Sequence, residues 1–249
     1  MLKQKLKDNE LTIGSWITIP DPIIAEIMSK HFDWLVIDME HSTITLDKAQ
    51  NIIRILSLTG CPALVRVNEN NPISIKGAMD AGASGIIVPM VNSREDVQKA
   101  LNAVHYPPFG TRGVGLARAQ DYGFGFDTYN KWQRTEPIVI AQIEHINGAL
   151  NLSSILQTPI DGIIVGPYDL SASLGAPGDF SCPAFTKILA DIEKTTKKYK
   201  KSLGYHIIQP KRCLVAQKIK EGYTFIAFSI DTLFLGTKIK EEVNGINKL

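Results

Sequence analysis

The sequence predicts an α/β protein in which eight parallel strands alternate with helices around one barrel, and three observations support this fold. Short apolar runs recur along the chain, and segments with apolar residues at helical spacing separate them. Several runs, such as residues 85–91 (GIIVPMV), are almost continuously apolar, as expected for strands that are covered on both faces. The chain has 249 residues, a length typical of a (β/α)8 barrel, or TIM barrel. We therefore expect a single domain over residues 1–249.

Turn and capping residues separate the elements expected in the first half of the chain. Asp21 followed by Pro22 is a typical helix start. Gly60 ends an amphipathic helix, and Ser93 caps another helix with Asp96 three residues along, a variant of the capping box. The strands of this half are therefore expected at residues 12–19, 35–38, 61–67 and 85–91, with helices at residues 22–28, 46–58, 72–81 and 94–104.

The alternation is interrupted at residues 105–136, which are rich in glycine, proline and aromatic residues and long for a connection. Long loops in compact domains are usually functional or disordered, and the aromatics and arginines here favour a functional loop. A turn that carries Asp169 is expected after the sixth strand. The alternation resumes with strands expected at residues 137–144, 160–166, 203–208 and 223–229 and helices at residues 148–156, 183–200, 210–221 and from 233 onward.

An open, doubly wound sheet is the alternative arrangement of alternating strands and helices. That fold commonly carries a glycine-rich dinucleotide-binding fingerprint directly after a strand. Here Gly113 and Gly115 lie inside the long loop, and Arg118 stands at the position of the third glycine. The sequence therefore favours the closed barrel.

The composition is that of a protein with a large core and no strongly charged face. Hydrophobic residues make up 44% of the chain and charged residues 21%, and the formal net charge of +2 argues against a nucleic-acid partner. The basic cluster at residues 194–201 fits the solvated end of a helix. Three cysteines without metal-ligand spacing, and the lack of a signal segment or a membrane-spanning apolar run, predict a cytoplasmic protein with no membrane partner.

A candidate site follows from residues 34–41 (WLVIDMEH), where an apolar strand breaks abruptly into Asp38, Glu40 and His41. Burying such groups without partners is costly, so they are expected at an open strand end that faces a ligand. The carboxyl ends of the strands are where TIM barrels place their chemistry. Other residues expected on the same rim are Trp16, Arg66, Gln142, Glu144, Gly166, Asp169 and His206.

The residue types on this rim indicate a metal-assisted reaction on a carboxylate substrate. Glu144 and Asp169, from neighbouring strands, suit a hard divalent cation. Arg66 suits bidentate binding of a substrate carboxylate, and His41 suits proton transfer near neutral pH. Structural alternatives exist for each group: Arg66 could pair with a carboxylate of the second strand, His41 could be a structural histidine, and His206 could be a wall residue of the pocket.

Several short motifs stand in a fixed order along the chain. They are residues 38–41 (DMEH), 64–67 (LVRV), 88–91 (VPMV), 106–108 (YPP), 111–113 (TRG), 141–144 (AQIE) and 166–171 (GPYDLS). Together they resemble the HpcH/HpaI aldolase family, and the resemblance spans roughly residues 10–236.

This resemblance implies a class II, metal-dependent aldolase, a carbon–carbon lyase that cleaves a 4-hydroxy-2-oxo acid or 2-keto-3-deoxy acid to pyruvate and an aldehyde. It implies that Glu144 and Asp169 hold Mg²⁺, Mn²⁺ or Co²⁺ and that Arg66 stabilises the enolate. His41 would be the base, acting through a metal-bound water, and Asp80 would orient it. The pyruvate pocket would be lined by Arg66, Gln142, Gly166, Pro167, Tyr168 and Asp169.

The resemblance also implies a homohexamer, a trimer of dimers, whose C-terminal helix packs on a neighbouring subunit. The chain departs from residues common in the family at His145, Tyr168 and His206, which could border the aldehyde. With Trp16, the two histidines are candidate specificity residues. The sequence leaves the aldehyde and the preferred metal open.

The same residues are compatible with other functions. A Schiff-base lysine is disfavoured, because no lysine falls within an expected strand. The same enolate could serve a thioester lyase, a condensing enzyme or an oxaloacetate decarboxylase, and Arg112, Arg118 and Arg134 are the candidates for a basic rim that would bind CoA. A non-catalytic barrel is the remaining alternative.

Overall fold

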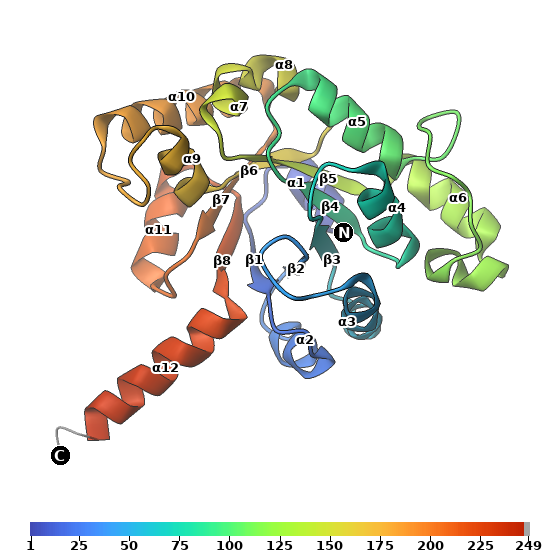
Figure 1. Ribbon diagram of the computed structural model, residues 1–249, viewed down its shortest axis with the longest axis horizontal. Helices are drawn as coiled ribbons and strands as arrows, with labels where there is room; N and C mark the ends of the chain where they lie inside the picture. Colours follow the sequence, from blue (N-terminus) through green and yellow to red (C-terminus); the bar gives the residue numbers. More distant parts are fainter. Residues whose placement is uncertain (247–249) are drawn as a thin grey trace.

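The computed structural model describes residues 1–246 and contains a closed barrel of eight parallel strands (Figure 1). Each strand pairs with the next one along the chain, and β8 closes the barrel against β1. This confirms the predicted TIM barrel. The strands are β1 (Thr12–Ile17), β2 (Trp34–Asp38), β3 (Ala63–Arg66), β4 (Gly85–Val88), β5 (Ile138–Ile143), β6 (Gly162–Val165), β7 (Ser202–Ile207) and β8 (Phe225–Ile230).

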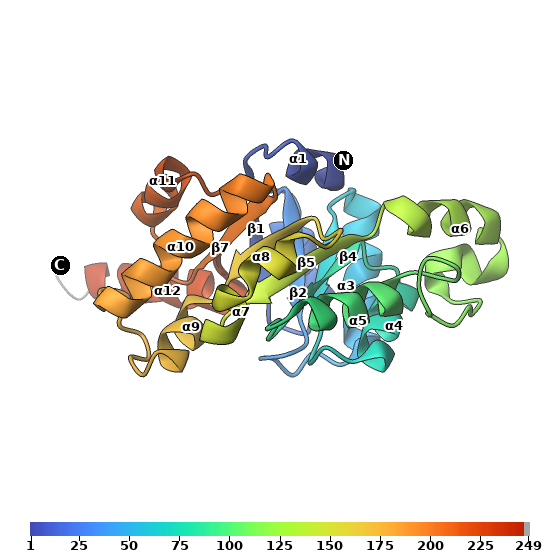
Figure 2. The same cartoon turned by 90° about the horizontal axis from the view of Figure 1, so that it is seen from above.

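The helices cover the outside of the barrel and one of its ends (Figures 1 and 2). They are α1 (Leu2–Lys7), α2 (Pro22–Met28), α3 (Leu46–Thr59), α4 (Pro72–Asp80), α5 (Arg94–Val104), η1 (Arg118–Gly123), α6 (Phe126–Thr135), α7 (Ile146–Leu150), α8 (Leu152–Leu156), α9 (Pro167–Ser173), α10 (Pro183–Tyr199), α11 (Arg212–Glu221) and α12 (Asp231–Ile246). The short helix α1 was not expected; its buried Leu2 and Leu6 join the cluster inside the barrel and close the amino ends of the strands. Figure 2 shows α1 at one end of the barrel and α7 and α9 at the other.

The capping signals in the sequence are confirmed. The Asp21 side chain accepts a hydrogen bond of 2.8 Å from the backbone N–H of Ile23, at the start of α2. Ser93 Oγ accepts from the backbone N–H of Asp96 at 3.1 Å, at the start of α5. Gly60 ends α3 in the left-handed conformation with φ of +75°, which glycine adopts without steric strain.

Some elements differ from the predicted ones. The predicted loop at residues 105–136 contains η1 and α6, and α6 forms because its ten residues include no glycine or proline and Tyr129 and Gln133 bury one face. The predicted helix at residues 148–156 is divided into α7 and α8. Asp169 was expected in a loop, but it lies in the first helical turn of α9. This helix begins at Pro167, because proline is favoured at the first position of a helix.

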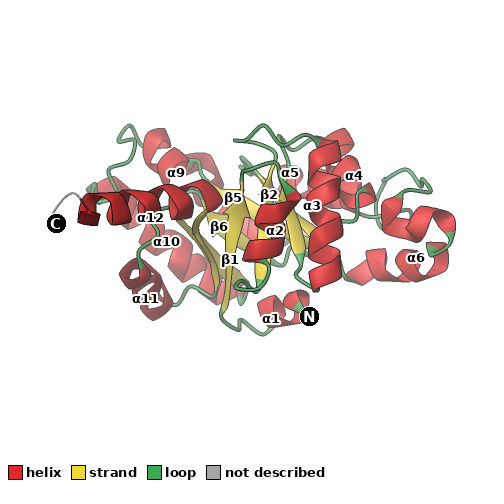
Figure 3. Cartoon of the chain, turned by 90° about the horizontal axis from the view of Figure 1, so that it is seen from below, coloured by secondary structure: helices red, strands yellow, loops and turns green. Residues whose placement is uncertain are grey.

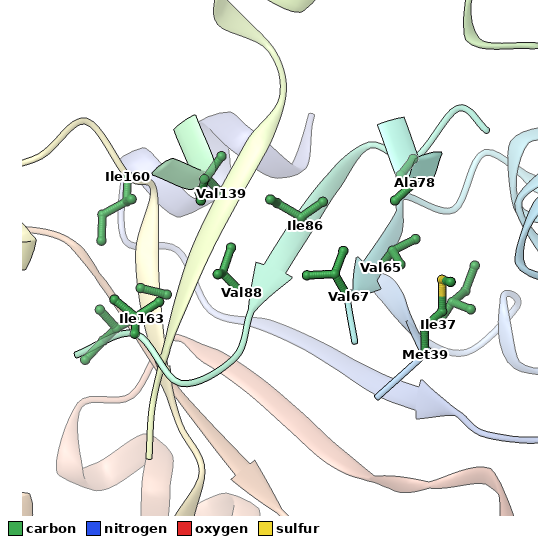
Figure 4. Close-up of a cluster of buried hydrophobic side chains, with 14 of the residues drawn as sticks. Ile37, Met39, Val65, Val67, Ala78, Ile86, Val88, Val139, Ile160 and Ile163 are labelled. Carbon is green, nitrogen blue, oxygen red and sulfur yellow. The ribbon is translucent and has the colours of Figure 1, made fainter. Parts of the chain in front are cut away.

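The core has an inner and an outer layer, divided by the barrel wall. Residues 37, 65, 86 and 139 are register partners on β2 to β5, and their side chains pack outward against the helices (Figure 4). Intervening residues point inward and form a separate cluster, because successive side chains of a strand alternate between its faces. Trp34 fills the inner layer beside Phe225, with ring centroids 4.0 Å apart. Glycine is required at position 14, where a Cβ would lie 2.1 Å from the Trp34 ring.

The last helix, α12, leaves the barrel and projects away from it (Figures 1 and 3). Four of its apolar side chains are exposed in the single chain: Leu235, Ile239, Val243 and Ile246. None of the helices formed by residues 1–246 is long and apolar enough to cross a membrane.

Candidate active site

The inward-facing positions at the carboxyl ends of the strands carry the polar residues that the sequence singled out. Asp38 and Arg66 are register partners at the ends of β2 and β3, and His206 lies near the end of β7. Because inward side chains of a closed barrel converge on its axis, these groups meet at one mouth. A cavity of about 160 Å³ opens there, and its lining consists of Trp16, His41, Arg66, Gln142, Ile164, Val165, Gly166, Pro167, Tyr168, Asp169, His206 and Ile208.

Arg66 is held by the carboxylates of the second strand. It donates hydrogen bonds to Asp38 from Nε at 2.9 Å and from Nη2 at 2.6 Å. Its Nη1 atom lies 3.1 Å from Glu40 Oε2, and its guanidinium carbon lies 4.4 Å from the centroid of the Trp16 ring. Within this chain Arg66 therefore pairs with carboxylates at the end of the second strand, which is the structural alternative that the sequence allowed. Its Nε–Nη2 edge is engaged by Asp38 and its Nη1 atom is paired with Glu40, so a substrate would bind the Nη1 side in competition with Glu40 or through the remaining Nη1 N–H.

Asp38 also shapes the turn that carries the imidazole. Its Oδ1 atom accepts hydrogen bonds from the backbone N–H groups of Glu40, at 3.1 Å, and His41, at 3.2 Å. The His41 side chain is 63% exposed, and its Nε2 atom lies 3.8 Å from Glu40 Oε2. His41 is therefore free to meet a substrate at the mouth, beside a carboxylate.

Glu40 belongs to the site, although the sequence suggested no role for it beyond its place on the rim. Burial raises the pKa of Glu40 to about 7, and the nearby charges of Glu144, Asp38 and Asp169 act in the same direction against the lowering effect of Arg66. A carboxyl group with a pKa near neutrality, next to the cavity residues His41 and Arg66, is a candidate for proton transfer. The signal in the sequence was its place between Asp38 and His41.

Glu144 is buried and held in one orientation. Its Oε1 atom accepts a hydrogen bond of 2.6 Å from the backbone N–H of Met90, and its Oε2 atom accepts one from the Gln142 amide. Met90 has a φ of +51°, in the left-handed region, so the predicted fourth strand ends at Val88 and not at residue 91. Burial raises the pKa of Glu144, since a charge is poorly solvated there.

The absence of a side chain at Gly166 makes room for this carboxylate. A Cβ at Gly166 would lie 2.9 Å from Glu144 Oε2 and 3.4 Å from the Gln142 amide nitrogen. Gly166 precedes α9, which carries Asp169 in its first turn. The negative charge of Asp169 is close enough to raise the pKa of Glu144 further.

The charges at the mouth suit a divalent cation. The charges of Asp38, Glu144 and Asp169 act on Glu40, that of Asp169 acts on Glu144, and Arg66 is the cation that acts on both glutamates. Asp169 is exposed, and its carboxylate accepts no hydrogen bond from the part of the chain that the structure describes. Within residues 1–246, no three His, Cys, Asp or Glu side chains form a ready metal cluster. Glu144 and Asp169 therefore fit a hard cation that takes its remaining oxygens from water or substrate.

Four buried polar atoms at the mouth find no hydrogen-bond partner among residues 1–246: Trp16 Nε1, Glu40 Oε2, Gln142 Oε1 and His206 Nε2, although Glu40 Oε2 forms an ion pair with Arg66. The His206 and Trp16 rings lie 4.9 Å apart between centroids. Burial lowers the pKa of His206 to about 3, and the charge of Arg66 acts in the same direction, so this imidazole is neutral. Such atoms are costly in a folded protein unless a ligand or water binds them.

Two of the predicted site residues lie away from this cavity. His145 caps α7, since its Nδ1 atom accepts a hydrogen bond of 3.2 Å from the backbone N–H of Asn147. Asp80 ends α4 shortly before β4 begins, on the outer side of the barrel and toward its amino end, whereas His41 follows the carboxyl end of β2. The charges that act on Asp80 are those of Arg112 and Lys76. A single chain therefore does not bring Asp80 to His41.

Comparisons with known proteins agree with this fold and show the family. A family model described as HpcH/HpaI aldolase/citrate lyase matches residues 12–235. The chain is 34% identical to a hydroxypyruvate/pyruvate aldolase of Roseobacter denitrificans, over 94% of this chain and 91% of that protein. It is 32% identical to a 2-keto-3-deoxy-L-rhamnonate aldolase of Klebsiella pneumoniae, over 93% of this chain and 87% of that protein.

Solved structures are similar along the whole chain. A HpcH/HpaI aldolase/citrate lyase family protein from Burkholderia cenocepacia superposes with a TM-score of 0.93 at 30% identity, covering 99% of this chain and 98% of that one. A citrate synthase superposes with a TM-score of 0.87 at 25% identity, covering 99% and 97%. The chain belongs to the HpcH/HpaI aldolase/citrate lyase family.

Proposed function

We propose that this protein is a metal-dependent aldolase that reversibly cleaves a 4-hydroxy-2-oxo acid to pyruvate and an aldehyde. The observation that carries the proposal is the group of four carboxylates around Arg66 at the carboxyl end of the barrel. So much negative charge in one mouth favours a divalent cation, and a 2-oxo acid offers two oxygens to such a cation. The two aldolases named above support this reaction class.

In this proposal Glu144 and Asp169 hold Mg²⁺, Mn²⁺ or Co²⁺, while Gln142 and the turn from Gly166 to Tyr168 line the pocket for pyruvate. A divalent cation bound there would draw electron density from the keto oxygen and so acidify the methyl protons. Arg66, oriented by Asp38, presents its Nη1 side to the same oxygen and stabilises its growing negative charge.

His41 is the proposed base. It is exposed at the mouth and lies 3.8 Å from the Glu40 carboxylate, which can share a proton with it. Asp80 can orient an imidazole only across a contact between subunits, because in one chain it lies toward the opposite end of the barrel from His41. The proposed role of Asp80 therefore depends on assembly.

The proposed assembly is a homo-oligomer, for which the resemblance implies a hexamer built as a trimer of dimers. Leu235, Ile239 and Val243 recur every four residues on α12 and are exposed in the single chain. A projecting helix with an apolar stripe needs a surface to cover that stripe. A neighbouring copy of the chain is the partner that we propose.

The acceptor aldehyde is proposed to enter over Tyr168, which is 48% exposed at the edge of the cavity and packs edge to face with Phe180. His145 lies farther out, at the start of α7. The resemblance implies that these positions differ from residues common in the family, so the aldehyde preferences of relatives need not apply to this chain.

Deuterium exchange into the methyl group of pyruvate tests the proposal. The protein is stripped with EDTA in D₂O, divided, and given Mg²⁺, Mn²⁺ or buffer alone, and the methyl signal is followed by NMR after the metal is chelated. Exchange that returns only with metal is the expected result. Exchange without metal would indicate a metal-free or Schiff-base reaction. No exchange under any condition would contradict the aldolase and favour thioester chemistry, as in the structurally similar citrate synthase.

A further inference from the structure

A second cavity lies beside the amino end of β4, away from the mouth of the barrel. It measures about 750 Å³ and is bordered by α3, η1, α6 and the turn before β4, on the side of the molecule where Figure 1 shows α3 and α6. Its charged lining side chains are Arg54, Arg118 and Asp121. Among the described residues, none lines both this cavity and the one at the mouth. Pockets for small molecules commonly measure about 300–1,000 Å³, so this cavity can hold a ligand of its own.

Arg118 is held in one orientation at the wall of this cavity. It donates hydrogen bonds from Nη1 to the carbonyl of Ala81 at 2.9 Å and from Nη2 to Ser57 Oγ at 3.1 Å. Gly82 makes room for the guanidinium, since a Cβ at that position would collide with Nη1. The sequence suggested Arg118 for a basic rim at the mouth, but this arginine lines the second cavity instead.

Arg54 is placed opposite a strained turn. It donates from Nη1 to Asn51 Oδ1 at 2.6 Å and from Nη2 to the Tyr122 hydroxyl at 3.4 Å. Tyr122 and the preceding Asp121 have φ values of +55° and +51°, a conformation that residues other than glycine rarely adopt. Strained residues of this kind are concentrated at functional sites. The turn therefore brings a hydroxyl group to Arg54 at a conformational cost that packing alone does not explain.

The cavity holds more positive than negative charge. None of the ion pairs formed by residues 1–246 includes Arg54 or Arg118, and Asp121 is the one carboxylate among the described lining residues. Burial lowers the pKa of Arg118, and the charge of Arg54 acts in the same direction, so the two guanidinium groups repel each other. A guanidinium has five N–H groups, and each arginine uses two of them, so three remain for a ligand. An anion between the arginines would use these donors and relieve the repulsion.

We propose that this cavity binds a phosphomonoester, with the phosphate group between Arg54 and Arg118. Guanidinium groups bind phosphate through paired N–H groups, and a phosphomonoester carries about −1.5 to −2 charges near neutral pH, enough to balance both arginines. The hydroxyl groups of Ser57, Ser84 and Thr128 line the same cavity and can donate further hydrogen bonds to a tetrahedral anion.

The organic part of the ligand packs on the aromatic wall of the cavity. Tyr129 and Trp132 form this wall, with stacked rings whose centroids lie 5.3 Å apart. A phosphate group alone would fill only a small part of about 750 Å³, so the site suits a phosphate group with an apolar or aromatic body. Because the site does not overlap the mouth, this inference is independent of the proposed aldolase function.

Calorimetric titration of the full-length protein tests the proposal, with EDTA present so that phosphate cannot bind through a metal ion at the mouth. The probes are phenyl phosphate, inorganic phosphate and phenol. We expect phenyl phosphate to bind more tightly than inorganic phosphate, and phenol to bind only weakly. Arg54→Gln and Arg118→Gln each remove a charged donor, so each should weaken phenyl phosphate binding about 10- to 100-fold. Arg94→Gln, at an exposed arginine outside the cavity, is the matched control and should leave the affinity unchanged.

Several results would overturn the proposal. A wild type that does not bind phenyl phosphate at concentrations up to about 10 mM has no such site. Equal affinities for inorganic phosphate and phenyl phosphate would mean that the arginines hold an adventitious ion only. Unchanged affinity in both cavity variants, or an equal loss in Arg94→Gln, would mean that the phosphate binds elsewhere or without specificity. Arg118→Gln removes the hydrogen bond that caps α4, so Arg54→Gln alone decides the question if that variant does not fold.

Discussion

Asp38 and Arg66 are register partners at the ends of two neighbouring strands, and Asp38 accepts two hydrogen bonds from the Arg66 guanidinium, at 2.9 Å and 2.6 Å. The same carboxylate accepts hydrogen bonds from two backbone N–H groups, those of Glu40 and His41, in the turn that carries His41. One side chain therefore sets the orientation of the guanidinium and of the proposed base. Both members of the pair are buried, so neither can exchange its partner for water.

Asp38→Asn should impair both stability and activity. Removing one charge of a buried pair leaves the other uncompensated, which typically costs about 3–5 kcal/mol of unfolding free energy. Urea unfolding measures this loss. The rate of deuterium exchange into pyruvate should fall by a larger factor than the affinity for pyruvate, because the orientation of Arg66 matters most for the negative charge that develops on the keto oxygen. Lys5→Gln, which breaks the exposed pair of Lys5 with Asp33, is the control and should change stability by less than about 1 kcal/mol. An equally small effect of Asp38→Asn would mean that Arg66 finds another partner.

Gly166→Ala should weaken metal binding without unfolding the barrel. The new methyl group would lie 2.9 Å from Glu144 Oε2, so the Glu144 carboxylate must move away from the position that its hydrogen bonds with Met90 and Gln142 define. Calorimetric titration with Mn²⁺ should show at least about tenfold weaker binding, and Glu144→Gln should abolish it. Gly113→Ala is the matched control, since its Cβ would meet no atom within 4 Å. Unchanged Mn²⁺ affinity in both site variants would place the metal elsewhere.

Alternating apolar runs and turn residues were sufficient to predict the barrel and the rim. The expected strands at residues 35–38 and 137–144 end in Asp38 and Glu144 because these carboxylates lie at the open mouth of the barrel. Proline and glycine content, by contrast, made residues 105–136 resemble one loop and concealed α6, whose own ten residues contain neither. Helix α9 was concealed because Pro167 was interpreted as part of a turn, although proline is favoured at the first position of a helix.

The contacts that define the site depend on distances that a sequence does not contain. The residue types allowed Arg66 to pair with a carboxylate of the second strand, but they did not show that Asp38 would take its bidentate edge, or that the backbone of Met90 would hold Glu144. The role of Asp80 was expected from the resemblance alone. In a single chain Asp80 is the last residue of α4 and lies toward the end of the barrel opposite the mouth. Spacing along the chain cannot show whether such a residue acts on its own subunit or on another.

The raised pKa of Glu40 predicts a pH dependence of stability in the metal-free protein. The pKa of this carboxyl rises on folding to about 7, so the native state retains a proton that the unfolded chain releases at lower pH. Its contribution therefore favours folding at acidic pH and is lost as the pH rises through about 7. Urea unfolding at pH 5 and pH 8, with EDTA present, should show that the wild type loses more stability than Glu40→Gln. Equal losses in the two proteins would mean that Glu40 is ionised throughout this range.

The exposed stripe on α12 predicts an oligomer that separates when the stripe is made polar. Ile239→Asp places a charge on a side chain that is 54% exposed in the single chain, so it should leave the barrel's own stability unchanged. If a neighbouring copy covers α12, the charge would be buried without a partner, and the assembly should dissociate. Light scattering after size-exclusion chromatography measures the mass, and Lys240→Asp, a charge change at the next position along the same helix, is the control. A wild type that already runs at the 27.5 kDa of one chain would contradict the proposed assembly, and with it any role for Asp80 across subunits.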